Sequence, residues 1–157
     1  MNIRNPYFWG VAVIGVILDQ ITKQWVVQAL PLNQPGLEII PGALVFFHTT
    51  NTGAAWSLFS ENGEWLRWLS LLVSLALIGL GLTARWPDRW EEVGYGFILS
   101  GAFGNGIDRF LSGEVVDFLQ VFPASGFPVF NLADVWINIG FICLLKVLLF
   151  DSKPAAR

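Results

Sequence analysis

Polar side chains recur at helical spacing in a chain that is otherwise strongly apolar. In three groups the members lie three or four residues apart, so each group would occupy one face of a helix. The groups are Asp19 and Lys23; Asn105, Asp108 and Arg109; and Asn131 and Asp134. A further acid, Asp117, lies in a β-prone stretch at 115–119. Carboxylates with amide and cationic neighbours are suited to acid–base chemistry.

Asp117 and Asp134 are the predicted catalytic pair. Two carboxyl groups in close proximity cannot both ionise easily, so such a pair shares one proton. The ionised member can take a proton from a water molecule as that water attacks an amide carbonyl. The protonated member can donate to the developing oxyanion and then assist the leaving amine. Because the pair titrates as a unit, the sequence does not order the two aspartates as acid and base.

Other hydrolytic chemistries have less support. A serine nucleophile needs a base, and the one histidine, His48, lacks a partner pattern and is expected to be a satisfied surface residue. No HExxH or Cys/His spacing occurs, so neither a metal nor a cofactor is predicted. The glycine-rich run 101–106 has no preceding strand, which argues against a phosphate loop and favours close helix packing.

The elements that must position these residues are predicted to be membrane helices. Apolar residues make up 54% of the 157-residue chain and charged residues 13%, against a usual charged share of about 25%. A spanning helix needs about 20 mostly apolar residues, and the segments 8–30, 65–84, 93–111 and 131–150 meet that length. The net charge of −3 and the lack of a basic patch argue against a nucleic-acid partner. We therefore predict one membrane-embedded, all-α domain over residues 1–157, with a small β element.

Lysine and arginine outside these segments set the predicted orientation. They are Arg4, Arg85, Arg89, Lys153 and Arg157. The connections 31–64 and 113–130 contain no lysine or arginine. The positive-inside rule therefore places both termini in the cytoplasm and the two long connections on the outer side. The β-prone residues 37–60 are predicted to form a small extracytoplasmic sheet between the first and second helices.

The depth of the polar residues separates two interpretations of them. Hydrogen bonds between helices hold many bundles together, and such residues can lie at any depth. Here the first and third helices run outward and the fourth runs inward, so Lys23, Arg109 and Asp134 reach one outer level. Charged groups in hydrocarbon cost about 3 kcal/mol each on insertion scales, so a shared water-accessible site explains their convergence better.

Five motifs, taken in order and spacing, resemble those of lipoprotein signal peptidases (signal peptidase II). They are Asp19-Gln-Ile-Thr-Lys23, Asn51-Thr-Gly-Ala-Ala55, Gly104-Asn105-Gly-Ile-Asp108-Arg109, Val115-Val-Asp117-Phe and Phe130-Asn131-Leu-Ala-Asp134. The resemblance runs from the first helix to the fourth, and five motifs in order are far more specific than any one. One departure is Trp56, where the family usually has phenylalanine; the exchange would affect the rim of the site and leave the aspartate pair untouched.

The resemblance implies a bacterial aspartic endopeptidase of the cytoplasmic (inner) membrane, with its site at the extracytoplasmic face. Such an enzyme removes the signal peptide from a prolipoprotein and cuts on the amino side of a cysteine that carries a diacylglyceryl group. Asp117 and Asp134 match its catalytic pair. The supporting positions are Asp19, Lys23, Asn51, Gly53, Asn105, Asp108, Arg109 and Asn131. No cofactor is implied, the partners are the precursor and membrane lipids, and the enzyme is expected to act as a monomer.

Several roles stay open at the level of the sequence. Asn51 and Asn131 are expected to hydrogen-bond the peptide or the dyad, and the sheet that carries Asn51 would cover the bound peptide. Arg109 is expected to hold either Asp108 or a substrate carbonyl. The acid of the first helix, Asp19, is expected to pair with the lysine one turn later and is also a candidate to orient the dyad.

Two other functions are compatible with a polar cluster in a membrane protein. One is a small ion-coupled transporter, in which membrane aspartates relay protons. The lack of inverted repeats disfavours it. The other is a structural membrane subunit whose polar face binds a partner helix.

Overall fold

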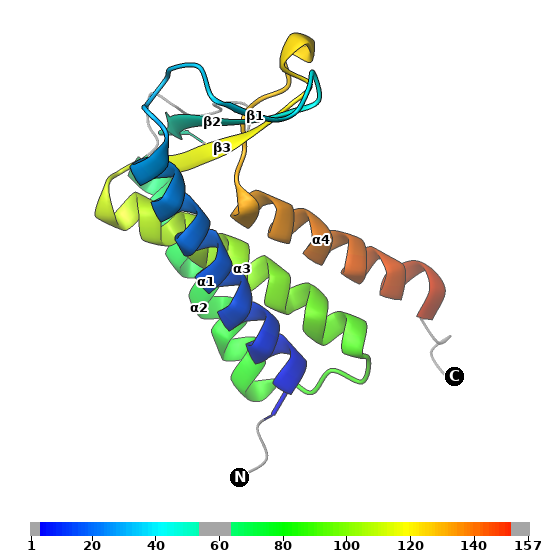
Figure 1. Cartoon of the computed structure of the whole chain (residues 1–157). Helices are drawn as coiled ribbons and strands as arrows, with labels where there is room; N and C mark the ends of the chain where they lie inside the picture. The colour runs from blue at the N-terminus through cyan, green and yellow to red at the C-terminus, as the bar shows by residue number, and fades with distance from the viewer. Residues whose placement is uncertain (1–3, 54–63, 152–157) are drawn as a thin grey trace.

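Four helices and a three-stranded sheet make up the structure, a computed structural model that describes residues 4–53 and 64–151 (Figure 1). The elements are α1 (Pro6–Ala29), β1 (Leu37–Ile40), β2 (Leu44–Asn51), α2 (Glu64–Thr83), α3 (Arg89–Leu111), β3 (Val115–Val121), a 3-10 turn η3 (Pro123–Ser125), α4 (Leu132–Lys146) and a π-helical turn η4 (Val147–Asp151). The four predicted helices are present, with ends shifted by a few residues. Trp56 and the two alanines of the Asn51 motif lie outside the described residues.

The third helix begins earlier than the hydropathy of its sequence indicates. It starts at Arg89, because the Asp88 side chain accepts a hydrogen bond of 2.6 Å from the backbone N–H of Trp90. An aspartate at this position satisfies a backbone donor that the first helical turn leaves unpaired. Capping therefore adds a polar first turn to α3 that an apolar window misses.

Within the described residues, three helical stretches are long and apolar enough to cross a membrane: α1, α2 and Leu132–Phe150. Their outer faces carry large apolar side chains that are more than half exposed, among them Ile14, Leu72 and Ile142. Broad exposed apolar faces of this kind are typical of surfaces that contact a membrane or another protein. The helix α3 is not in this set, because it carries charged residues towards both ends, and it packs against the other three helices.

Small residues let α3 approach its neighbours closely. A Cβ added at Gly101 would collide with the backbone carbonyl of Ala133 in α4. One added at Gly104 would lie 2.5 Å from Asp19 Oδ2 in α1. The run 101–106 therefore serves helix packing, as predicted, and brings α1 and α4 onto the same helix.

The sheet lies across one end of the helices (Figure 1), and its strand order is β1-β2-β3, all antiparallel. The sheet predicted between the first and second helices is present as β1 and β2. The extended stretch of the second connection adds a third strand, β3, which pairs with β2 and was not predicted to join the sheet. The register aligns Thr49 with Asp117 and Asn51 with Val115, with an irregularity between Phe46 and Thr49. Sheet pairing thus joins the two long connections and carries Asp117.

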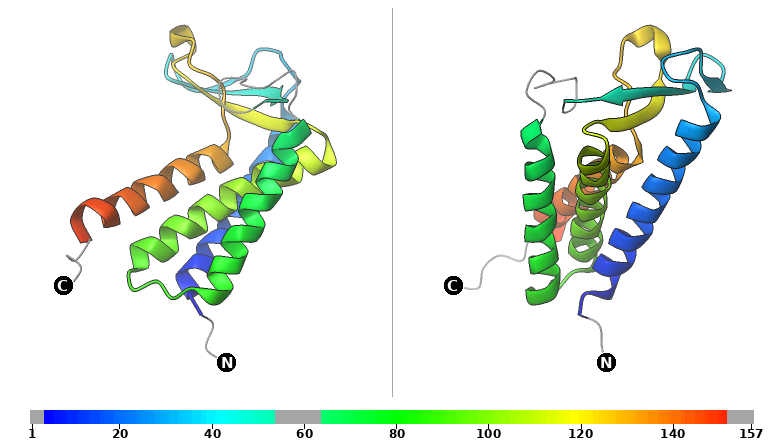
Figure 2. Two further views of the ribbon diagram at one scale, coloured as in Figure 1. Left: turned by 180° about the vertical axis from the view of Figure 1, so that it is seen from behind. Right: turned by 90° about the vertical axis from the view of Figure 1, so that its left-hand side faces the viewer.

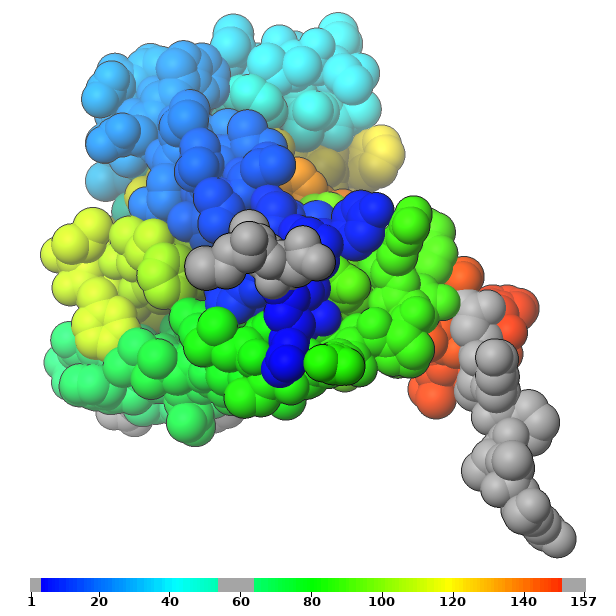
Figure 3. Space-filling model, turned by 90° about the horizontal axis from the view of Figure 1, so that it is seen from below, coloured from blue at the N-terminus to red at the C-terminus, as the bar shows by residue number. Residues whose placement is uncertain are grey.

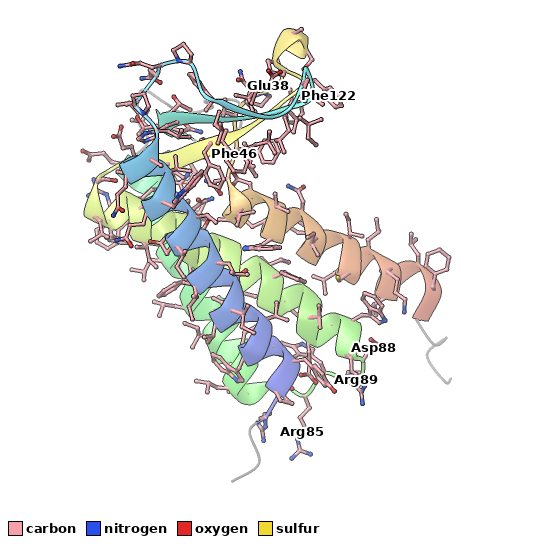
Figure 4. All side chains as sticks on the ribbon, in the orientation of Figure 1. Glu38, Phe46, Arg85, Asp88, Arg89 and Phe122 are labelled. Carbon is pink, nitrogen blue, oxygen red and sulfur yellow. The ribbon has the colours of Figure 1, made fainter. Side chains whose placement is uncertain are left out.

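The opposite end of the molecule holds the start of α1 and the α2–α3 connection, where Figure 4 labels Arg85, Asp88 and Arg89. The Asn5 side chain donates to the carbonyls of Gly81 and Ala84, at 3.0 Å each. Seen from this end, the start of α1 lies against α2 and α3 (Figure 3). Carbonyls at the end of α2 are thereby satisfied by a neighbouring side chain.

Enlarging Gly101 should destabilise the protein. Gly101→Ala pushes a methyl group into a backbone carbonyl, and we expect the free energy of unfolding to fall by about 1–3 kcal/mol, as for other overpacked interiors. Gly10→Ala in α1 is the matched control, since nothing lies within 4 Å of its added Cβ. Thermal unfolding in detergent measures both. A Gly101→Ala protein as stable as the control would contradict the packing argument.

Candidate active site

Asp117 and Asp134 lie together, and each of their four carboxylate oxygens accepts one N–H. Asp117 Oδ1 accepts from Asn131 Nδ2 at 2.7 Å, and Asp117 Oδ2 accepts from Asn51 Nδ2 at 3.2 Å. Asp134 Oδ1 accepts from Asn105 Nδ2 at 2.9 Å, and Asp134 Oδ2 accepts from the backbone N–H of Asn131 at 3.2 Å. Because a carboxylate oxygen has two lone pairs, each keeps one for a proton or a water molecule.

The start of α4 fixes Asp134 through local sequence. Asn131 is the N-cap, and its side-chain oxygen accepts from the backbone N–H of Asp134 at 3.1 Å. The Asp134 carboxylate in turn accepts the backbone N–H of Asn131, which completes a capping box. A carboxylate in the first helical turn is also favoured by the positive end of the helix dipole. Spacing of three residues between Asn131 and Asp134 is what this geometry requires.

The sheet fixes Asp117 and brings Asn51 to it. Asp117 aligns with Thr49, so Asn51 is its diagonal neighbour on the next strand. Asn51 also accepts a 2.9 Å hydrogen bond from the backbone N–H of Gly53, which closes a turn at the end of β2. Asn51 is therefore oriented by its own turn and directs its amide N–H at the dyad.

Beneath the dyad, three charged side chains form a buried ionic cluster. Lys23 Nζ lies 2.9 Å from Asp19 Oδ2 and 2.8 Å from Asp108 Oδ2. Lys23 also donates to Asn105 Oδ1 at 2.9 Å, and Asn105 in turn donates to Asp134. The predicted Asp19–Lys23 pair is confirmed. Lys23, and not Arg109, is the cation that holds Asp108.

Arg109 lies beside this network and ties the sheet to the helices. Its Nη2 donates to the carbonyl of Gly53 at 3.1 Å, and its Nη1 donates to Ser70 Oγ in α2 at 3.3 Å. Within the part of the chain that the structure describes, the buried Nε has no hydrogen-bond partner. The Nε–H is therefore a buried donor that no described residue satisfies.

Burial and a neighbouring charge change the acidity of Asp117. Its side chain is buried, with 3% of its surface exposed. Burial and then the nearby Asp134 carboxylate raise the pKa of Asp117, hydrogen bonds from Asn51 and Asn131 oppose the rise, and the net pKa is about 7. Asp117 therefore holds its proton at a pH where an ordinary aspartate has lost it.

A cavity of about 910 Å³ opens onto the dyad from between α2, α3 and α4. Figure 2 shows α4 diverging from the other helices with distance from the sheet. Asn105, Arg109, Asp117 and Asp134 line its polar end, and the walls beyond are apolar, among them Leu69, Val73, Ile98, Ile137 and Ile142. An apolar cavity with a few converging polar groups is the usual form of a ligand site.

The structure brings the predicted site residues together and adds two that sequence reasoning missed. Gln20 donates hydrogen bonds to both Asp19 and Asp108. Its spacing of three residues from Lys23 on the same helix face could have identified it from the sequence. Ser70 was missed because a lone serine in an apolar helix carries no pattern. His48 is buried and not on the surface, with Nδ1 2.9 Å from the carbonyl of Leu30. Among the described residues, no group of three or more His, Cys, Asp or Glu side chains could hold a metal ion.

Known proteins with similar sequences share one function by name. A lipoprotein signal peptidase of Cyanothece sp. is 55% identical and aligns with 100% of this chain and 91% of its own. Its counterpart in Nostoc sp. is 57% identical, over 98% of this chain and 95% of its own. Another in Microcystis aeruginosa is 58% identical, over 90% and 91%.

Solved structures and a family model agree with these relatives. Two bacterial membrane enzymes, solved by the in meso method at 2.3 and 1.9 Å resolution, superpose with TM-scores of 0.82 and 0.78. They are 32% and 33% identical to this chain and cover 94% and 90% of it, or 91% and 92% of their own chains. The model of signal peptidase (SPase) II matches residues 11–150. The chain therefore belongs to the signal peptidase II family.

Proposed function

We propose that this chain is an intramembrane aspartic endopeptidase that removes the signal peptide from diacylglyceryl-modified prolipoproteins, cutting on the amino side of the lipidated cysteine. The observation that carries the proposal is the pair Asp117 and Asp134, each oxygen held by one N–H, at the polar end of an apolar cavity. Membership of a peptidase family favours hydrolysis over the transporter and structural alternatives.

Unequal surroundings divide the labour between the two aspartates. Asp134 lies in the first turn of α4, where the helix dipole favours its negative charge. Asp117 is buried on a strand and holds the proton at neutral pH. We assign Asp134 to take a proton from the attacking water. Asp117 donates its proton to the carbonyl oxygen as the water adds, which gives a tetrahedral gem-diol. Asp134 then passes the proton it took from water to the amide nitrogen, the C–N bond breaks, and the amine leaves while the gem-diol returns a proton to Asp117 as it becomes the new carboxyl group.

Substrate chemistry is matched by the two ends of the cavity. A signal peptide is an apolar helix, and the diacylglyceryl cysteine that follows the scissile bond places its acyl chains in hydrocarbon beside it. The walls that include Val73, Ile98 and Ile142 would accept apolar groups, while the peptide bond reaches the dyad. Arg109 lines the cavity, and we assign its guanidinium to a carbonyl of the substrate, the second of its two expected roles.

Orientation follows from charge. Arg85 and Arg89 lie at the end of the bundle away from the sheet (Figure 4), and Arg4 lies there too, because it donates to the carbonyls of Leu82 and Thr83 at the end of α2. The positive-inside rule assigns this end to the cytoplasm. With both termini on that side and four spans, α3 crosses the membrane in contact with α1, α2 and α4. The dyad then lies at the extracytoplasmic surface of the bacterial inner membrane, and one copy of the chain supplies all of its groups.

Removing either carboxyl group should abolish cleavage. Asp117→Asn and Asp134→Asn keep the side-chain volume and remove one acid–base group, so we expect kcat to fall by at least 10²-fold, the lower range for general acid–base catalysis. Cleavage of a lipid-modified precursor in detergent measures this. Asp88→Asn, at the opposite end of α3, is the matched control, since asparagine also caps helices. Wild-type rates in both dyad variants would refute the dyad.

The reaction should slow above about pH 7. Because its pKa is raised to about 7, Asp117 keeps its proton below that pH and loses it above. Since the mechanism needs that proton, kcat should fall about tenfold per pH unit at the limit. The measurement is kcat from pH 6 to 9 with saturating precursor. A kcat that stays constant to pH 9 would show that the proton of Asp117 is not required.

The lipid on the substrate should matter for binding. A precursor without the diacylglyceryl group loses apolar contact with the cavity walls, and burial of apolar surface contributes about 25 cal/mol per Å². We expect a higher KM with a smaller change in kcat, measured with matched modified and unmodified precursors. Equal turnover of the two forms at low concentration would remove lipid recognition from the proposal.

A further inference from the structure

We infer that a cluster of four side chains, here named the clamp, sets the separation of the two dyad aspartates. Gln20, as a member of the clamp, is then a positioning residue for the reaction. The inference rests on the proposed function. Two carboxylates outside the dyad, Asp19 and Asp108, each hold the residue immediately before a dyad aspartate. The clamp is defined as these four side chains: Asp19, Gln20, Lys23 and Asp108.

Each acid of the clamp grips a backbone N–H. Asp19 Oδ1 accepts from the N–H of Ala133 at 3.0 Å, one residue before Asp134. Asp108 Oδ2 accepts from the N–H of Val116 at 3.2 Å, one residue before Asp117. Asp19 is fully buried and Asp108 is 8% exposed. The positions of α4 and β3 at the dyad are therefore tied to these two carboxylates.

Two donors, Lys23 and Gln20, bridge the carboxylates of Asp19 and Asp108. Lys23 Nζ lies within 3 Å of one oxygen of each, as given above. Gln20 Nε2 donates to Asp19 Oδ2 at 3.2 Å and to Asp108 Oδ1 at 3.0 Å. It also donates to the carbonyl of Gly104 at 3.2 Å, which anchors it to α3. Like charges repel, so the distance between the two acids depends on the donors between them.

Gln20 reaches the dyad through other groups. In the described part of the chain, its hydrogen bonds go to Asp19, Asp108 and Gly104 and to neither dyad aspartate. Without Gln20, Lys23 alone would hold the two acids, and one oxygen of Asp108 would lose its donor. The backbone N–H groups that these carboxylates hold would then move with them, which changes the separation of Asp117 and Asp134.

A change in that separation has a signature in the pH profile. The groups that face Asp117 are Asn51 on β2, Lys23 on α1, Asp108 and Arg109 on α3, and Asn131 and Asp134 on α4. Repulsion from Asp134 contributes to the raised pKa of Asp117. If the two aspartates move apart, that contribution weakens, the pKa falls, and activity is lost at a lower pH than in the wild type.

The test is Gln20→Met, which keeps an unbranched side chain of similar length and removes the donor. Gln24→Met is the matched control, because Gln24 lies one turn further along α1 and is exposed. Both proteins are assayed as full chains in detergent with the lipid-modified precursor. We measure kcat, KM, the pH profile and the folded fraction from thermal unfolding.

We expect Gln20→Met to lower kcat by roughly ten- to hundredfold, as for small displacements of reacting groups, with KM unchanged and the alkaline limb at lower pH. The control should match the wild type. A kcat and alkaline limb equal to those of the wild type would overturn the clamp. So would a kcat that falls only in proportion to the folded fraction while the limb stays in place.

A second variant keeps the test valid if Gln20→Met does not fold. Gln20→Asn retains the amide but is one methylene shorter, so it can reach only one of the two carboxylates, and the same outcomes decide. Asp117→Asn in the same assay separates this inference from the proposed function. Cleavage by Asp117→Asn would remove the dyad itself, whereas an inactive Asp117→Asn beside a fully active Gln20→Met would remove the clamp alone.

Discussion

A lysine ammonium buried between two carboxylates is the interaction on which the rest of the site depends. Lys23 is 3% exposed, and it lies between Asp19 and Asp108 at ion-pair distance. Taking such charges out of water costs several kcal/mol per ion, and attraction alone repays that cost only when the remaining polar atoms are satisfied. Here the oxygens that face away from Lys23 accept N–H groups from Ala133 and Gln20, and the Asp108 oxygen that faces it also accepts the N–H of Val116. Loss of one member would leave an uncompensated buried charge, so the cluster is stable as a unit and joins α1, α3, α4 and β3 at one point.

The position of α3 follows from the same constraint. A helix that carries Asn105, Asp108 and Arg109 cannot turn these side chains to lipid without a large cost. It lies among the other helices instead, and its glycines allow them to approach: Gly104 admits the Asp19 carboxylate, and Gly101 admits the backbone of α4. Small residues and charged residues therefore occur together on α3, and each kind supports the other. Close packing excludes water from the ion pairs, and the ion pairs draw the helices together.

The parts of this structure that sequence could predict are those set by local spacing. Hydropathy gave the helices, and the three-residue interval from Asn131 to Asp134 is that of a capping box. What spacing could not give is pairing between distant segments. The bulge in β2 is an example: Phe46 contacts Trp25 of α1 and Asn51 contacts Asp117, although residues five apart in a regular strand point to opposite faces. The extra residue between them lets both face the helices. A sequence also does not show which backbone N–H a side chain will bind, so the hydrogen bonds from Val116 to Asp108 and from Ala133 to Asp19 were not predictable.

Two aspartates of equal chemistry are made unequal by the elements that carry them. Asp134 belongs to a helix start, where the backbone N–H of Asn131 and the helix dipole favour a negative charge. Asp117 belongs to a strand, which offers its side chain no such field, and its surroundings are set by burial and by Asp134 itself. The proton therefore rests on the strand. This asymmetry needs a fixed separation, because repulsion between the carboxylates varies with distance. A helix and a strand from different parts of the chain have no fixed separation of their own, and the buried lysine cluster is the structure that provides it.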